Sequence, residues 1–137
     1  MWWIYALLSA LFAALTAIFA KMGVSHVNSN LATAIRTVVI LIVSWLIVLM
    51  RGEIKELGTI SKQSLLMLVI SGIATGLSWI FYFKALQVGK IAQVAPVDKL
   101  SVALAIVLAA IFLHEAITLK MAIGAVLIIA GTLVLIF

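Results

Sequence analysis

The sequence contains no cysteine and a single proline, and charged residues make up only 9% of it. Without cysteine there can be no disulfide, no thiolate metal ligand and no cysteine nucleophile, and two isolated histidines, His26 and His114, cannot form a zinc site alone. The sequence also lacks an HExxH motif, a phosphate-binding glycine-rich loop and a Ser-His-Asp spacing, and a lone buried carboxylate cannot supply paired acid/base chemistry. We therefore expect no enzyme, no metal and no cofactor.

Apolar residues are abundant instead. They make up 67% of the 137 residues, and the mean hydropathy is +1.41. A soluble domain is about 45–50% apolar and about 25% charged, and a disordered chain has low hydrophobicity with high charge. This composition predicts an integral membrane protein.

The net charge of +5 does not indicate nucleic-acid binding. No basic arm or aromatic stacking motif is present. Many of the cations lie in or beside short connections between apolar runs, where lysine and arginine meet anionic lipid headgroups; these are Arg51, Lys55, Lys62, Lys90 and Lys120. We expect membrane lipids, not nucleic acid, as their partners.

Five runs have the length of about 20 residues that a helix needs to cross the hydrocarbon core: residues 2–20, 31–50, 64–83, 91–113 and 119–137. They are predicted to be helices, because open strands cannot satisfy their backbone in lipid. The first run lacks the basic segment that begins a signal peptide. The connections are too short for a further domain, so residues 1–137 are predicted to form a single all-α transmembrane domain, multi-pass in a cell membrane, which we expect to be a prokaryotic inner or plasma membrane.

An odd number of spans places the two termini on opposite sides of the membrane. Three cations then lie on the side where the first helix ends and four on the other side, namely Lys21, Lys84 and Lys90 against Arg51, Lys55, Lys62 and Lys120. Since cation bias sets orientation, this near balance permits insertion in both orientations, and two opposite copies would form an antiparallel dimer of ten helices. A single fixed orientation is the alternative.

Polar residues of several helices fall on single faces. Tyr5, Ser9, Phe12 and Thr16 follow spacings of four, three and four, and so do Ser71, Thr75, Ser78 and Tyr82. We predict a polar cavity lined by the first four helices, with the fifth peripheral. The alternative is ordinary bonding of each hydroxyl to its own helix or between helices. The candidate substrate-binding residues on these faces are Thr75, Ser78, Trp79, Tyr82 and Ser101.

Small residues mark two packing faces. Gly72 and Gly76 form a GxxxG pattern that allows close approach of another helix, and we favour packing within one chain over a dimer contact for it. Gly124 and Gly131 lie seven residues apart on an otherwise apolar helix. That helix is the candidate for the dimer contact.

Three charges lie inside the predicted spans: Arg36, Asp98 and Lys99. Charges at such depth are costly, and they are commonly paired or placed against water. The depths of Arg36 and Asp98 differ by only about 3 Å at about 1.5 Å per residue, so this pair is reachable. Lys99 points about 100° away from Asp98 around an ideal helix, and we expect it to find another acceptor, water or the membrane surface.

Pro96 precedes these charges and has no backbone N–H to donate, so we expect it to loosen the start of the fourth helix or to delay it. Broken helices beside charged groups are typical of transporters. A structural ion pair in a passive scaffold is the alternative.

Several stretches resemble the EamA-type repeat of the drug/metabolite transporter superfamily, and in particular its half-length, five-helix members. The likeness covers nearly the whole chain and is strongest from Gly72 onward. It rests on residues 83–89 (FKALQVG), 95–101 (APVDKLS) and 112–115 (FLHE), on the glycines of the last helix, and on Lys21-Met22-Gly23 and Arg36-Thr37. His114 departs from the family pattern, which has glycine before the glutamate that matches Glu115, so the resemblance does not carry over a tight glycine-type turn after the fourth helix, whereas the fold is unaffected.

The resemblance implies that this chain is one inverted-repeat unit of a ten-helix transporter, working as an antiparallel homodimer with small metabolites or amphiphilic compounds as cargo. A secondary transporter, proton-coupled or facilitative, is thus the first hypothesis, because no nucleotide site is present. A non-transporting membrane subunit of a larger complex is the second, and a flippase of lipid-linked substrates is the third. The sequence does not specify the cargo or the direction of transport.

Overall fold

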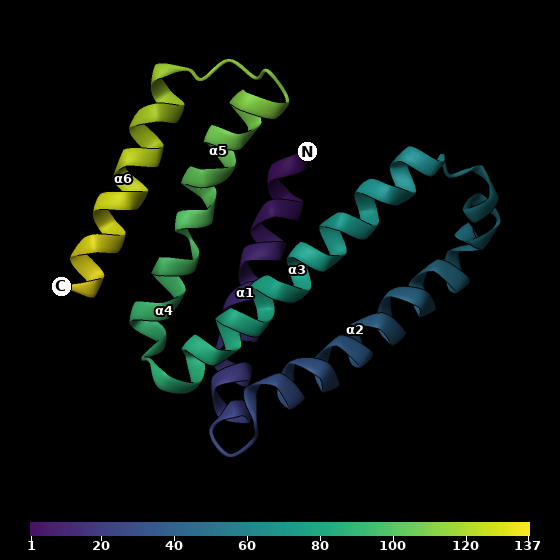
Figure 1. The fold of residues 1–137 in the computed structure, drawn as a ribbon, viewed down its shortest axis with the longest axis horizontal. Helices are drawn as coiled ribbons and strands as arrows, with labels where there is room; N and C mark the ends of the chain where they lie inside the picture. Colours follow the sequence, from purple (N-terminus) through teal and green to yellow (C-terminus); the bar gives the residue numbers. More distant parts are fainter. The chain divides into compact units, whose positions relative to one another are not determined.

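The computed structural model describes residues 1–137, and they form helices without any strand (Figure 1). In chain order the elements are α1 (Trp2–Val24), α2 (Ser29–Arg51), the 3₁₀ helix η1 (Glu53–Thr59), α3 (Lys62–Val88), α4 (Ile91–Asp98), α5 (Leu100–Phe112) and α6 (Leu119–Ile136). Five helical segments are long and apolar enough to span a membrane, with α4 and α5 together forming the fourth. The predicted all-α fold with five spans is confirmed.

Some helices extend beyond their predicted ends. The third was predicted to end at Phe83, but α3 continues to Val88. Lysine, alanine, leucine and glutamine are all good helix formers, and no helix-breaking residue occurs before Gly89. The second helix begins at Ser29, because the side chain of Asn28 accepts hydrogen bonds from the N–H groups of Asn30 (2.9 Å) and Leu31 (3.4 Å) and so caps its first turn.

The fourth span was predicted as one helix and is interrupted. It begins at Ile91, so Pro96 does not delay its start, and the interruption follows the proline: α4 ends at Asp98 and α5 begins at Leu100. The N–H of Lys99 is shared between the carbonyls of Ala95 (3.3 Å) and Pro96 (3.0 Å), a three-centre arrangement common where a helical turn tightens.

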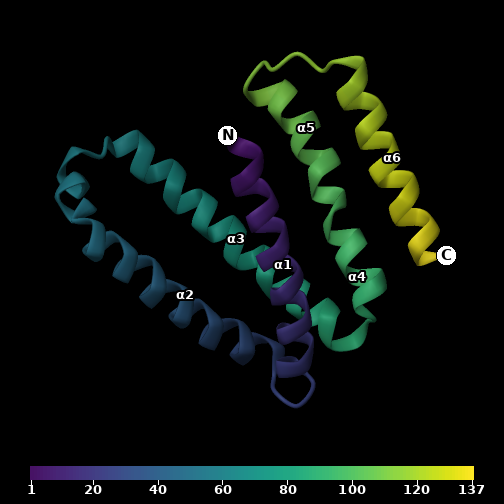
Figure 2. The same ribbon diagram turned by 180° about the vertical axis from the view of Figure 1, so that it is seen from behind.

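The chain divides into two compact units, residues 1–19 with 88–137 and residues 20–87. In the first unit α6 packs against both α4 and α5, and the three lie side by side in both views of the ribbon (Figures 1 and 2). Thr132 of α6 is buried there. The last helix is therefore tied to the interrupted span, a contact that we did not predict.

In the second unit the largest fully buried side chains are Val24, Phe83 and Leu86. Two polar side chains form hydrogen bonds in the same region. Gln87 donates from Nε2 to the carbonyls of Val24 (3.2 Å) and Val27 (3.0 Å), and Lys21 donates from Nζ to the carbonyl of Leu86. The last carbonyls of a helix lack partners within it, so Gln87 satisfies the end of α1.

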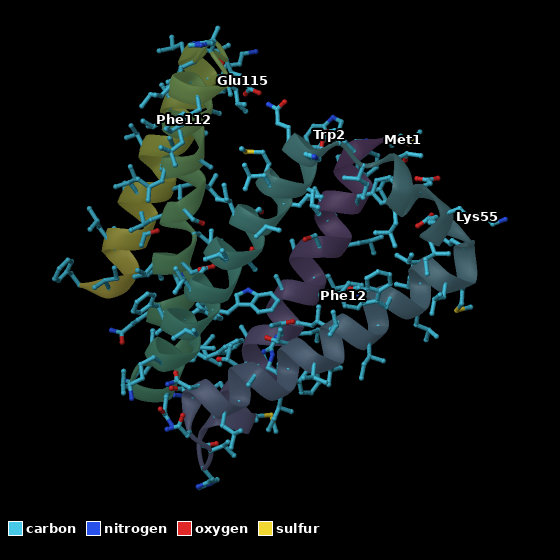
Figure 3. The ribbon with its side chains drawn as sticks, turned by 45° about the vertical axis from the view of Figure 1, so that its right-hand side comes forward. Met1, Trp2, Phe12, Lys55, Phe112 and Glu115 are labelled. Carbon is cyan, nitrogen blue, oxygen red and sulfur yellow. The ribbon has the colours of Figure 1, made fainter.

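Most large apolar side chains are left uncovered. Trp2 is 80% exposed and Phe112 is 75% exposed, and both project from the ribbon, whereas the charged Lys55 and Glu115 lie in the connections at helix ends (Figure 3). In a membrane this apolar surface meets lipid tails that are as apolar as itself. The chain is a multi-pass membrane protein.

The link after α5 contains a left-handed residue. His114 has a φ of 54°, a conformation that non-glycine residues adopt uncommonly, with histidine among the more tolerant. This is the position at which the family pattern has glycine. His114 thus adopts, without being glycine, a backbone conformation that glycine favours.

We expect His114→Gly to stabilise the protein by about 1 kcal/mol, because glycine removes the strain of a positive φ and gives back part of the gain through its larger unfolded-state entropy. His114→Val should destabilise it, since a β-branched residue fits this region least. Denaturation in detergent micelles, followed by helical circular dichroism, measures both. A glycine variant less stable than the parent protein would contradict this account of the turn.

Candidate functional site

The interruption of the fourth span carries two opposite charges. Lys99 Nζ lies 3.2 Å from Asp98 Oδ2, and the two side chains are 59% and 34% exposed within the chain. The expectation that Lys99 needs an acceptor other than Asp98 was wrong. The helical turn tightens at Lys99, which keeps a helical backbone conformation (φ −71°, ψ −10°), and its long side chain reaches back to its neighbour.

The hydroxyl group of Thr132 on α6 lies beside this interruption. Thr132 Oγ1 lies 3.2 Å from the carbonyl oxygen of Pro96 and 2.8 Å from that of Ile128. Its single proton is thus shared between a carbonyl of its own helix, which is the nearer acceptor, and a carbonyl on the last turn of α4. Thr132 was missed as a site residue, although it is the one polar side chain in the apolar body of its helix, and that isolation was the available signal.

Arg36 has an aromatic partner. Its guanidinium carbon lies 4.4 Å from the centroid of the Phe83 ring, within the range of a cation–π interaction. Phe83 is only 1% exposed, and its ring meets that of Tyr82 in an edge arrangement with centroids 5.6 Å apart. Arg36 and Tyr82, both predicted site residues, therefore lie around one buried ring, and the pairing of Arg36 with Asp98 stays a prediction because the two belong to different units.

The other predicted residues are not gathered around this ring by any recorded contact. Thr75 Oγ1 donates to the carbonyl of Ser71 (2.9 Å), which is the bonding within a helix that we named as the alternative. Ser78 on α3 and Ser101 on α5 are exposed, and Trp79 on α3 is partly covered. Their role in substrate binding stays a prediction, as does the cavity lined by four helices.

Four glycines had been assigned to helix packing. A side-chain carbon built at Gly72 or Gly76 would meet no other atom of its unit within 4 Å, and the same holds for Gly124 and Gly131. No neighbour within the units therefore packs closely against these glycines. Packing at these positions stays a prediction, and it needs a partner that these units do not supply.

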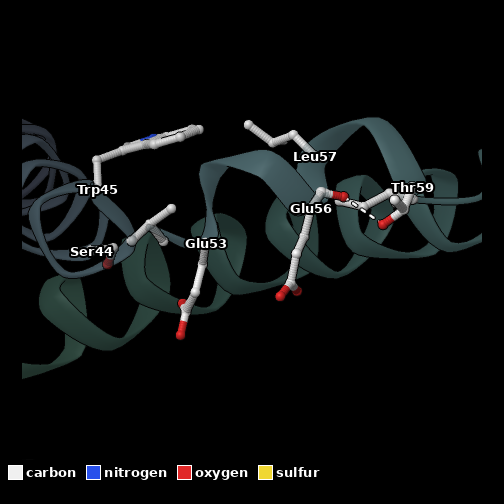
Figure 4. A pocket seen from close by; sticks show the side chains of 8 residues that line it. Ser44, Trp45, Glu53, Glu56, Leu57 and Thr59 are labelled. Atoms are coloured by element: carbon white, nitrogen blue, oxygen red, sulfur yellow. Dashed lines mark hydrogen bonds between the residues drawn. The ribbon is translucent and has the colours of Figure 1, made fainter. Parts of the chain in front are cut away.

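A cavity of about 320 Å³ lies at the end of α2, where η1 folds against it (Figure 4). The residues that line it include Trp45, Leu57, Glu53 and Glu56, and the lining is mostly apolar. The sequence analysis did not predict this cavity, because it treated the connection between the second and third spans only as too short for a further domain.

Comparison with known proteins identifies the family. The model of the EamA-like transporter family matches residues 1–137. The chain belongs to this family. A protein of Sinorhizobium sp. named "Uncharacterized transporter in cobO 3'region" is 48% identical over 134 residues, which cover 98% of this chain and 95% of that protein. No solved structure matches the chain.

These findings confirm the resemblance drawn from the sequence, and the length of the chain fits a half-length member of the family. With five membrane-spanning helices, the protein is a membrane transporter by family. Its site candidates are the charges at the break in the fourth span and the cation–π pair formed by Arg36 and Phe83.

We expect Asp98→Asn and Lys99→Gln to be non-additive in stability, with an interaction free energy of about 0.5–3 kcal/mol. Either single change leaves one charge without its partner at the helix break, whereas the double change removes both. Denaturation of the four proteins in micelles measures the cycle.

A second cycle, with Arg36→Gln in place of Lys99→Gln, tests the pair that the sequence predicted. Additivity of Asp98→Asn with Lys99→Gln would mean that the 3.2 Å ion pair contributes nothing. Coupling in the second cycle would instead assign Asp98 to Arg36.

Proposed function

We propose that the protein is a secondary transporter that moves a small metabolite or an amphiphilic compound across the cell membrane as an antiparallel homodimer. The observation that carries the proposal is the ion pair of Asp98 and Lys99 at a break within the fourth span. In many transporters the sites for substrate and coupling ions are formed by interrupted helices near the middle of the membrane. Membership of a transporter family supports the same reading.

Asp98 is the group that we assign to proton coupling. A proton on its carboxylate cancels the attraction to Lys99, whose ammonium then turns to another acceptor. Binding of a proton and binding of substrate are thereby linked through one pair of charges. Coupled transport needs such a linkage. The polar residues Thr75, Ser78, Trp79, Tyr82 and Ser101, together with Arg36, are the proposed substrate contacts.

A second, inverted copy completes the site in this proposal. One chain supplies five spans, and the resemblance to two-repeat transporters implies a substrate cavity at the interface of two inverted repeats. The glycines of α6 support the contact between copies, because nothing in their own unit lies within 4 Å of a side chain built there. Two chains together provide the ten helices.

In liposomes that hold the purified protein alone, we expect Asp98→Asn to abolish accumulation driven by a pH gradient and to leave downhill exchange partly intact. Asparagine keeps the shape and some hydrogen bonding of the aspartate but cannot titrate. A panel of labelled metabolites and amphiphilic compounds provides the substrates.

Glu115→Gln is the matched control, because it removes one carboxylate outside the spans. Accumulation by Asp98→Asn equal to that of the parent protein would make Asp98 structural and the protein a facilitator. If the parent protein moves no compound of the panel but moves lipid-linked sugars, the third hypothesis, a flippase of lipid-linked substrates, is supported instead. If it moves neither, the second hypothesis, a non-transporting membrane subunit, is supported instead.

The antiparallel arrangement predicts which glycines meet. Gly124 lies five residues after the first residue of α6, and Gly131 lies five residues before its last, so in an antiparallel pair Gly124 faces Gly131 of the second copy. Co-expressed Gly124→Cys and Gly131→Cys copies should therefore cross-link to each other. The background is clean because the chain has no native cysteine.

Cross-linking of each variant only with itself would indicate a parallel pair and would contradict the dual insertion. A reporter fused after Phe137 that appears on one side of the membrane only would contradict it as well.

A further inference from the structure

The charges inside the membrane-spanning segments do not balance. Asp98 is the single acidic residue of the five spans, because the other three acids of the chain lie in the connections. Arg36 and Lys99 are both cations within those spans. Whichever of them pairs with Asp98, the other has no counter-charge among the spans, and a second copy of the chain adds the same charges without changing the sign of the excess. A charge at such depth is costly unless it is paired or meets water.

The ion pair of the fourth span leaves Arg36 as the unmatched charge. Lys99 Nζ lies 3.2 Å from Asp98 Oδ2, and no carboxylate lies within 4 Å of Arg36 in its own unit. The adjacent hydroxyls of Thr33 and Thr37 are neutral, and they donate to carbonyls of α2 itself (2.8 and 2.9 Å). The unit therefore holds a partly buried guanidinium without an anionic partner.

An aromatic contact holds this guanidinium inside the unit. Arg36 lies about 10 Å into α2 at about 1.5 Å per residue. Its Cζ lies 4.4 Å from the centroid of the Phe83 ring, and Phe83 is 1% exposed. A cation–π contact stabilises the positive charge, but an arginine has five N–H donors, and the ring supplies no oxygen to accept from them. The site thus combines a fixed cation with donors that still need an acceptor.

We infer that the substrate of the proposed transporter is an anion whose carboxylate or phosphate group binds Arg36. The inference rests on the proposed function and specifies the chemical class of its cargo. The anion supplies the counter-charge that the spans lack, and the planar fork of a guanidinium donates two parallel hydrogen bonds to such a group. The phosphate of an anionic phospholipid has the same chemistry, so the test separates a soluble anion from a lipid headgroup.

The test measures binding by the shift in the thermal unfolding midpoint of the purified full chain in lipid-free micelles of a neutral detergent. The probes form matched sets in which one skeleton, propyl, phenylpropyl or octyl, carries a carboxylate, a phosphonate, a carboxamide or a primary ammonium. We expect anionic members to raise the midpoint, because they supply the missing counter-charge. The carboxamide and ammonium members of the same sets should leave it unchanged.

Three variants locate the binding group. Arg36→Gln should weaken the binding of the anionic probes about 10- to 100-fold, the range for hydrogen bonds to a charged group. Arg36→Lys keeps the charge but loses the planar fork, so its affinity should lie between the two. Arg51→Gln is the matched control, because it removes an arginine from the end of the same helix, where its side chain is 71% exposed, and it should bind like the parent protein. Circular dichroism checks that each variant is folded.

Three results would overturn the inference: a higher midpoint with the ammonium members in place of the anionic ones, an affinity for the anionic probes that is unchanged in Arg36→Gln, or no stabilisation by any soluble anion. Stabilisation by dioleoyl phosphatidylglycerol alone belongs to the third result and would assign Arg36 to a lipid headgroup. Failure of the proposed transport gives a different pattern, because the anionic probes would then bind through Arg36 without being moved into liposomes.

Discussion

The hydrocarbon interior of a membrane offers no water to the backbone, so each N–H and C=O group within it needs a partner in the protein. The rest of this structure depends on that constraint. All five spans are helical, and the interruption at Lys99 occurs where substitutes are at hand: its N–H is shared by two carbonyls, and the Pro96 carbonyl lies within hydrogen-bond distance of Thr132. The same constraint explains why the side chains of Asn28 and Gln87 form hydrogen bonds with backbone groups at the start of α2 and at the end of α1.

Charge follows the same logic, because a charged group in the spans is costly unless it is paired or covered. Asp98 and Lys99 neutralise each other at the one break within a span. Arg36 lies inside an unbroken helix, and the face of a buried phenylalanine ring lies below its guanidinium. The two acids of the second unit, Glu53 and Glu56, lie at the end of α2, where the chain leaves the apolar region.

Several site features could be predicted because they depend on local chemistry. The charges of the spans stand out in an apolar sequence, and several local stretches, of which the run from Ala95 to Ser101 is the most specific, indicated the family, which the comparisons confirm. Other features could not be predicted. The ion pair of Asp98 and Lys99 lies where the helical turn tightens between α4 and α5, and periodicity assumes a regular helix. The left-handed turn at His114 likewise depends on how the chain leaves α5.

By itself the sequence determined the membrane location, the number of spans and the family, since each of these follows from composition, from the length of apolar runs or from a local motif. Only the tertiary structure decided which groups meet. Thr132 and Pro96 are 36 residues apart, and Gln87 and Val24 are 63 residues apart. Contacts of this kind depend on the side chains that two helices present to each other, and helical periodicity specifies the face of one helix but not its partner.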